Sequence, residues 1–217
     1  MPDINRYIES TGLKSTTTKN DVLELCQEAL QYNFYGVCIP PYFVQQAKRF
    51  VKENKAKTKI ITVIGFPLGY LSVASKVEEA KKAIQDGADE LDVVVNLSAY
   101  LSGDLAVVKN DINSVVTACQ LQNKIVKVIL ETGALTENQI LELADIVAEA
   151  NANFVKTSTG YYEKGVSLDA VKLLRKHLPE KIGIKASGSI KTREFALDLL
   201  DAGANRLGTS SAKNLLK

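Results

Sequence analysis

The stretch "SVASKVEEAKKAIQDGADELDVVVN" (residues 72–96) contains a helix-like segment and, directly after it, a strand-like segment. Its first part, residues 72–87, places apolar residues at helical spacing and ends on Gly87, a natural helix stop. Its last part, "ELDVVVN" (90–96), is rich in valine and leucine, as buried strands are. A helix joined to a strand by a short turn is the repeating unit of parallel sheets.

The same unit recurs along the whole chain. Strand-like runs occur at residues 11–14, 36–40, 59–66, 90–96, 124–131, 154–158, 183–188 and 206–210. Amphipathic helices are predicted at residues 19–32, 72–87, 136–151, 167–178 and 192–203, with a short last one at 212–217. Asn20 or Asp21 is the expected N-cap of the first of these helices, and Thr136 with Gln139 forms a capping box on the third.

Eight such units in 217 residues, with no linker between them, predict a single-domain (β/α)8 TIM barrel of parallel strands over residues 1–217. The alternative is a doubly wound open sheet. That fold normally carries a glycine-rich dinucleotide loop after its first strand, and "TGLKS" (11–15) is no such loop.

Composition excludes several function classes. The chain is 46% hydrophobic and 24% charged, with a net charge of +2 and no basic block, so no nucleic-acid partner is expected. No apolar stretch is long enough to span a membrane, and the first ten residues lack the apolar core of a signal peptide. Three scattered cysteines suggest reduced thiols and a cytoplasmic protein, and a lone histidine, His177, predicts no metal site.

Strand alternation brings charged residues to one place. In "ELDVVVN" (90–96), Asp92 opposes the apolar set that should face the helices, and the same holds for Lys127, Lys156 and Lys185 in later strands. These four side chains therefore should face the lumen near the carboxyl ends of the strands, where barrel active sites lie. A structural ion-pair network, or lysines that reach out to solvent, would explain each of them without a function.

Three lysines and one aspartate should make an electropositive pocket. Burial and neighbouring ammonium groups both disfavour charge, so at least one lysine is expected to be partly unprotonated near neutral pH. A neutral amine attacks carbonyl carbons and forms Schiff bases. The pattern indicates covalent amine catalysis on an aldehyde or ketone.

Small-residue turns after the last strands predict an anion site. The segments "KASGSIKTREF" (185–195) and "LGTSSAKN" (207–214) each lead through a glycine and serines into a helix start. Barrel enzymes commonly bind phosphate there, and Thr159 with Gly160 would add a third edge. Plain helix capping by serine and threonine is the other interpretation.

Together these segments resemble the motif set of the deoxyribose-phosphate aldolase family. The matching runs are "VIGFPLG" (63–69), "ELDVVVN" (90–96), "KVILETG" (127–133), "FVKTSTG" (154–160), "IKASGSIKT" (184–192) and "GANRLGTSS" (203–211). The resemblance implies a class I lyase on a TIM barrel, active without metal or other cofactor. It reversibly cleaves 2-deoxy-D-ribose 5-phosphate to D-glyceraldehyde 3-phosphate and acetaldehyde, in deoxyribose catabolism, and is expected to be a homodimer.

The resemblance also assigns roles to residues. It implies that Lys156 forms the Schiff base, that Lys185 lowers its pKa, and that Asp92 relays protons with Lys185. The residues expected to bind substrate or phosphate are Thr159, Gly160, Gly188, Ser189, Gly208, Ser210 and Ser211, and possible pocket residues are Thr11, Cys38 and Lys127.

The chain departs from the family's pattern near its first two strands and in one phosphate turn. Glu9, Ser10 and Gly12 differ from the usual "IDHTLLKP" start, Pro40 lies in "VCIPP" (37–41) in place of "VCVNP", and Ser189 replaces a glycine. Two alternative functions stay open: another phosphosugar barrel enzyme, either transaldolase-like or an isomerase with Glu131 as base, and a non-catalytic barrel that binds a phosphorylated metabolite.

Overall fold

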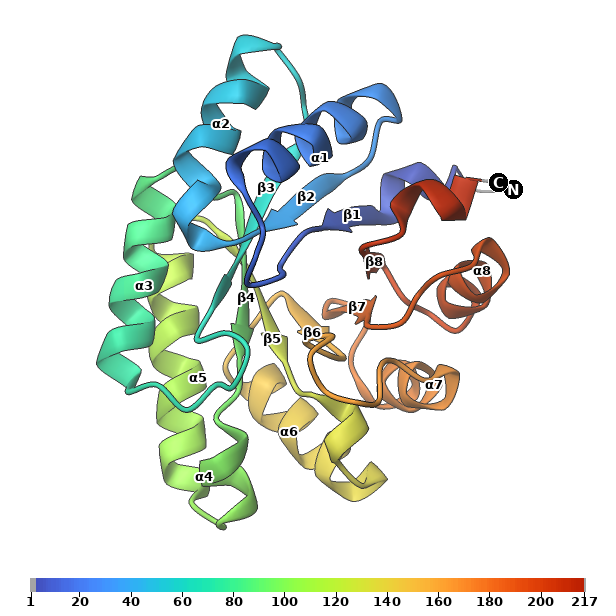
Figure 1. Ribbon diagram of the computed structural model, residues 1–217. Helices are drawn as coiled ribbons and strands as arrows, with labels where there is room; N and C mark the ends of the chain where they lie inside the picture. The colour runs from blue at the N-terminus through green and yellow to red at the C-terminus, as the bar shows by residue number, and fades with distance from the viewer. Residues whose placement is uncertain (1–2, 217) are drawn as a thin grey trace.

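The computed structural model describes residues 3–216 as one closed barrel of parallel strands, ordered β1 to β8, with β8 paired to β1 (Figure 1). The strands are β1 Ile8–Thr11, β2 Gly36–Ile39, β3 Lys59–Ile64, β4 Glu90–Val94, β5 Ile125–Ile129, β6 Phe154–Lys156, β7 Gly183–Ser187 and β8 Arg206–Thr209. The predicted single-domain (β/α)8 TIM barrel is confirmed.

Helices surround the ring of strands on the outside (Figure 1). The α-helices are α1 Lys19–Gln31, α2 Val44–Glu53, α3 Val73–Gln85, α4 Leu97–Leu101, α5 Leu105–Gln120, α6 Glu137–Glu149, α7 Leu168–His177 and α8 Arg193–Asp201. Short 3-10 helices are η1 Ile4–Tyr7, η2 Pro41–Phe43, η3 Thr132–Ala134 and η4 Ala212–Leu216. No helix among the described residues is long and apolar enough to cross a membrane.

Helix caps follow the sequence closely, with one correction. Thr136 and Gln139 form the predicted capping box of α6. The N-cap of α1 is Thr18, whose hydroxyl accepts the Asp21 N–H, so the prediction of Asn20 or Asp21 was wrong. Asp21 instead accepts the Thr18 N–H at 2.7 Å and completes a capping box from the third helical position.

The first strand also differs from the prediction. It covers Ile8–Thr11, where residues 11–14 were expected. Its place is fixed by pairing on both sides, since Glu9 lies opposite Gly36 of β2 and Gly208 of β8. A charged residue in the middle of so short a strand hides the β pattern, and this shift carries Glu9 into the barrel.

The two faces of the strands have different cores. Toward the helices, an extended apolar core includes Leu91, Val93, Val126, Val155 and Ile184, each fully or almost fully buried. Burying one such aliphatic side chain stabilises the fold by about 1.5–3 kcal/mol. The predicted helix-facing sets are therefore confirmed, and the opposite faces of the strands are left to line the lumen.

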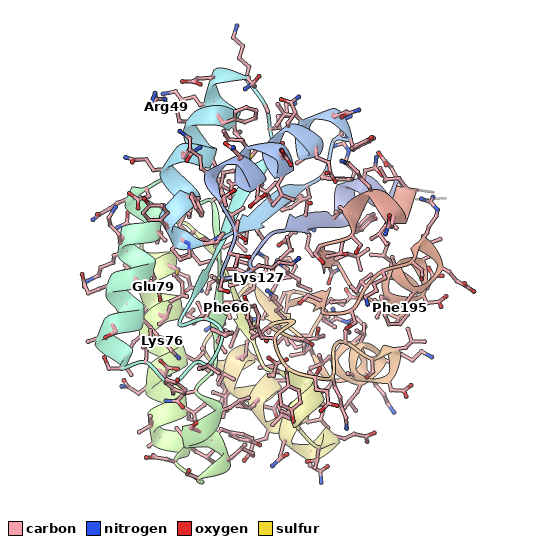
Figure 2. The ribbon with its side chains drawn as sticks, viewed as in Figure 1. Arg49, Phe66, Lys76, Glu79, Lys127 and Phe195 are labelled. Carbon is pink, nitrogen blue, oxygen red and sulfur yellow. The ribbon has the colours of Figure 1, made fainter. Side chains whose placement is uncertain are left out.

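The lumen itself has an apolar part and a charged part. Cys38, Ile61 and Val63 form a small separate cluster, against which Leu13 and Phe66 pack. Figure 2 labels Lys127 and Phe66 inside the ring of helices, whereas Arg49 and Phe195 lie on the outer helices. The charged part holds the predicted functional residues.

Candidate active site

Asp92 is the centre of the charged part of the lumen. Its Oδ2 accepts hydrogen bonds from the Nζ of Lys185 at 2.6 Å and of Lys156 at 2.9 Å, and its Oδ1 from Lys127 Nζ at 3.0 Å. Strand register explains the meeting, because Asp92 lies beside Lys127 on β5, and Lys156 of β6 lies beside Lys185 of β7. The predicted convergence of these four residues is confirmed.

The excess of positive charge is smaller than expected, because two further carboxylates enter the cluster. Glu9 of β1 is fully buried and pairs closely with Lys185, and it lies 3.6 Å from Lys127. Glu90 of β4 lies 2.6 Å from the same Lys127. Three lysines and Arg206 of β8, which approaches Glu9 at 3.9 Å, thus face three carboxylates.

The added carboxylates change the expected pKa values of the lysines, two of which are raised and not lowered. Burial alone would raise the pKa of Asp92, but the three surrounding ammonium groups hold it well below its usual range. Burial alone would lower the pKa of Lys185, but Asp92 and Glu9 raise it well above the usual value for lysine. The pKa of Lys127 is raised in the same way, against burial, by Asp92 and Glu9. Lys185 and Lys127 are therefore charged in this network.

Access distinguishes the three lysines. A cavity of about 720 Å³ opens at the carboxyl ends of the strands, and Lys156 lines it. Lys127 and Lys185 are absent from that lining, and both are completely buried. Lys156 also has one carboxylate partner, Asp92, whereas Lys185 has two. Among the three, Lys156 is the amine that a molecule in the cavity would meet.

All but one of the residues predicted to bind substrate or phosphate line the same cavity. Its lining includes Thr159, Gly160, Gly188, Ser189, Gly208 and Ser210, from the loops after β6, β7 and β8. Gly188 and Ser189 have φ angles of +92° and +62°, so this turn is left-handed. Ser211 is outside the lining, and its N–H donates to the Thr209 hydroxyl at 2.9 Å.

Of the three possible pocket residues, one lines the cavity and two lie below it. Thr11 lines the cavity. Cys38 lies in the floor below it, with its Sγ 3.9 Å from Asp92 Oδ2, and burial raises the pKa of its thiol to about 11. Lys127 lies in the floor as well, held by Asp92 and Glu90. These two residues shape the cluster under the cavity without reaching into it.

Sequence analysis missed several residues of this site. Glu90 is two positions before Asp92, so strand alternation alone should have placed it in the lumen. Glu9 was hidden by the misplaced first strand. Tyr161, Leu13 and Lys14 line the cavity mouth from loops whose conformation no periodicity predicts.

Comparison with known proteins agrees with this geometry. The family model for DeoC/LacD family aldolases matches residues 7–216. A deoxyribose-phosphate aldolase of Thermococcus gammatolerans is 47% identical over 99% of this chain and 96% of the relative. An aldolase structure described as QR15 superposes with a TM-score of 0.93 at 37% identity, over 99% of this chain and 95% of the other. The deoxyribose phosphate aldolase of Aeropyrum pernix, described as tetrameric, superposes with a TM-score of 0.91 at 34% identity, over 100% of this chain and 91% of the other.

A match over nearly the full length, in sequence and in structure, establishes the relationship. The chain belongs to the DeoC/LacD aldolase family and, within it, to the deoxyribose-phosphate aldolases.

Proposed function

We propose that this lyase reversibly cleaves 2-deoxy-D-ribose 5-phosphate to D-glyceraldehyde 3-phosphate and acetaldehyde, through a Schiff base on Lys156. The observation that carries the proposal is the position of Lys156, which is the cluster lysine that lines the cavity and lies 2.9 Å from Asp92. An amine next to a proton-accepting carboxylate has what nucleophilic catalysis on an aldehyde needs.

The chemistry follows from this arrangement. The Lys156 amine, once it has lost a proton, adds to the C1 carbonyl of the open-chain sugar, and loss of water leaves an iminium. The C2–C3 bond then breaks as its electrons move toward the iminium, and the C3 hydroxyl loses its proton. This releases glyceraldehyde 3-phosphate and leaves an enamine on Lys156. Protonation of the enamine at C2 and hydrolysis release acetaldehyde and restore the amine.

Asp92 and Lys185 are placed to move the protons of these steps. Asp92 Oδ2 lies between the two amines, at 2.9 Å from Lys156 and 2.6 Å from Lys185. A charged Lys185 supplies a proton donor, and a group that accepts and returns protons at this position speeds each step. No cofactor is needed in this scheme, because side chains carry every step.

The loops after β7 and β8 support a phosphorylated substrate. Gly188, Ser189, Gly208 and Ser210, which carry backbone N–H groups and, in the serines, hydroxyls, line the same cavity as Lys156. Such small-residue turns next to a helix start suit a phosphate. Binding the phosphate there would hold C1 of the sugar in place for attack by Lys156.

The isomerase alternative has less support. Its candidate base, Glu131, is almost fully buried and outside the cavity lining. Its carboxylate already accepts hydrogen bonds from the N–H and the hydroxyl of Thr159. A transaldolase-like enzyme would share the Schiff base, so only substrate assays separate it from the proposal.

The proposal is tested by trapping the intermediate. Incubation with acetaldehyde and sodium borohydride should leave an ethyl group on Lys156, mapped by peptide mass spectrometry. Lys156→Ala should lose the adduct and at least about a thousandfold in cleavage rate. Lys191→Met is a control, since Lys191 also lines the cavity but is exposed and, among residues 3–216, forms no ion pair with the carboxylates of the charged cluster.

Absence of an adduct, with cleavage surviving in Lys156→Ala, would reject the Schiff-base mechanism.

The homodimer and the cytoplasmic location stay predictions. Because the Aeropyrum pernix structure is described as tetrameric, light scattering on the purified protein is the measurement for the oligomeric state.

A further inference from the structure

Tyr161 connects three loops at the mouth of the cavity. It lies in the loop after β6, and its hydroxyl donates to the Leu13 carbonyl in the loop after β1, at 2.7 Å. Its ring meets Phe66, in the loop after β3, edge to face, with ring centroids 5.3 Å apart. Tyr161 is nevertheless 53% exposed, so packing alone does not explain its position.

The loop that carries Tyr161 is itself anchored to the barrel. The Tyr161 N–H donates to the Thr159 hydroxyl oxygen at 3.0 Å. Thr159 in turn donates its N–H, at 3.3 Å, and its hydroxyl to the carboxylate of Glu131, at the end of β5. Tyr161 is therefore held at its backbone by Glu131 and Thr159, close after Lys156 in the chain.

The loop that Tyr161 holds forms much of the cavity wall. Gly12, Leu13, Lys14, Thr16 and Thr17 all line the cavity. Leu13 also packs on the apolar cluster of Cys38, Ile61 and Val63, deep in the lumen. Figure 2 labels Phe66, the other contact of Tyr161, inside the ring of helices. The loop thus lies over the apolar part of the lumen, beside Lys156.

We propose that Tyr161 is a positioning residue that ties the β1–α1 loop across the cavity and so limits the size of aldehyde that reaches Lys156. This inference rests on the proposed Schiff-base function. A small aldehyde reaches the amine with the loop tied down. A branched aldehyde needs the loop to move away, and therefore reacts in proportion to the open population.

The structure offers a matched pair of variants. Tyr161→Phe removes the hydroxyl that binds Leu13 and keeps the ring against Phe66. Tyr162→Phe makes the same chemical change one residue later, where the hydroxyl has no hydrogen-bond partner among residues 3–216. Tyr162 does not line the cavity.

Loss of one hydrogen bond should raise the open population of the loop about fivefold. Two measurements report this change. In Tyr161→Phe, amide hydrogen exchange over residues 12–17 should become about fivefold faster. The ratio of the borohydride trapping rates on Lys156, 3-methylbutanal over acetaldehyde, should rise about fivefold. Tyr162→Phe should match the unaltered protein in both measurements.

The outcomes separate this inference from the proposed function. If Tyr161→Phe and Tyr162→Phe have the same exchange and the same ratio of trapping rates, Tyr161 does not hold the loop. Faster exchange with an unchanged ratio would overturn its effect on specificity. If acetaldehyde gives no adduct even in the unaltered protein, the proposed function fails, while hydrogen exchange still tests the tie itself.

Discussion

At the scale of single residues, the three lysines around Asp92 differ in how many other carboxylates they contact. Asp92 pairs with three ammonium groups, and two of these, on Lys127 and Lys185, also pair with at least one further carboxylate. A lysine with two or more anionic partners stays protonated at neutral pH, and an ammonium group is not a nucleophile. Lys156 has Asp92 alone and the cavity in front of it.

The pairing of Glu9 with Lys185 predicts that Glu9 helps to keep Lys185 protonated. Glu9→Gln removes one of the anions that raise the pKa of Lys185. The pKa of Lys185 should fall, so this residue loses its proton at a lower pH than before. The alkaline side of the pH profile of kcat/KM should therefore move to lower pH, measured with the cleavage assay from pH 6 to 11.

The conservative variant Glu9→Asp is the control, since it keeps the negative charge. It should leave the alkaline limb close to that of the unaltered protein, even if the rate falls. An alkaline limb that Glu9→Gln leaves in place, or moves upward, would contradict a role of Glu9 in setting the charge of Lys185.

Among residues, the sequence was sufficient where alternation alone decides. Asp92, Lys127, Lys156 and Lys185 stand on strands whose apolar sets are easily recognised, so their lumenal position could be predicted. The lumenal positions of Glu9 and Arg206 could not be predicted, because each residue lies at or near the start of a short strand with a weak apolar alternation. The expected positive charge of the cluster was too large because the carboxylates of Glu9 and Glu90 were left out.

At the scale of elements, an ion pair behind the site braces the ends of two strands. Lys76 of α3 is fully buried, and its Nζ donates to Asp111 of α5 at 2.6 Å and to the Val94 carbonyl, at the end of β4, at 2.8 Å. A Cβ at Gly65, just after β3, would lie 2.8 Å from Lys76 Cε. Figure 2 shows Lys76 and Glu79 along α3.

Removing one member of this pair should cost more than removing both. Burial lowers the pKa of Lys76, against the attraction of Asp111, and raises the pKa of Asp111, against the attraction of Lys76. Lys76→Met leaves Asp111 buried without its cation and should lower the free energy of unfolding by about 3–5 kcal/mol. The double variant with Asp111→Leu should regain most of this loss. Urea unfolding at pH 7 measures both.

A matched surface pair provides the comparison. Lys109 and Glu149 pair at 3.0 Å with both side chains substantially exposed, so Lys109→Met should change stability by less than about 1 kcal/mol. A Lys76→Met variant as stable as Lys109→Met would show that the buried pair does not brace the strands.

Element by element, long apolar strands and capped helices could be predicted, and short or charged ones could not. The capping box on α6 was identified because its residues are local in sequence. The position of β1 was not identified from the sequence, because its pairing with β2 and β8 defines this strand more than its own residues do. The connections across the cavity mouth, such as Tyr161 to Leu13, join residues far apart in sequence and leave no local pattern.

At the scale of the whole molecule, the charged residues of the proposed mechanism also connect the strands of the barrel. The cluster joins strands from β1 to β8 across the lumen, through Glu9, Asp92, Lys127, Lys185 and Arg206. Burying so many ions is costly unless all of them are paired. The fold is therefore expected to be stable only at a pH where both signs of charge are present.

Linkage gives the limits of that pH range. The pKa of Asp92 is lowered on folding from about 3.8, so its contribution is complete above that value and is lost as pH falls through the lower, folded value. The pKa of Lys185 is raised on folding from about 10.5, so its contribution is complete below that value and is lost as pH rises further. Between these limits the contribution of the cluster should be constant.

The Asp92→Asn variant isolates the acid side of this range. At pH 7 it leaves three buried ammonium groups short of one anion, and the free energy of unfolding should fall by about 3 kcal/mol or more. Below about pH 3.8 the unaltered protein begins to lose the same stabilisation, so the difference between the two proteins should shrink steadily. Urea titrations at pH 3, 5, 7 and 9 measure it, with Asp201→Asn as the exposed control. A difference that stays constant down to pH 3 would mean that Asp92 is not the charge on which the closed barrel depends.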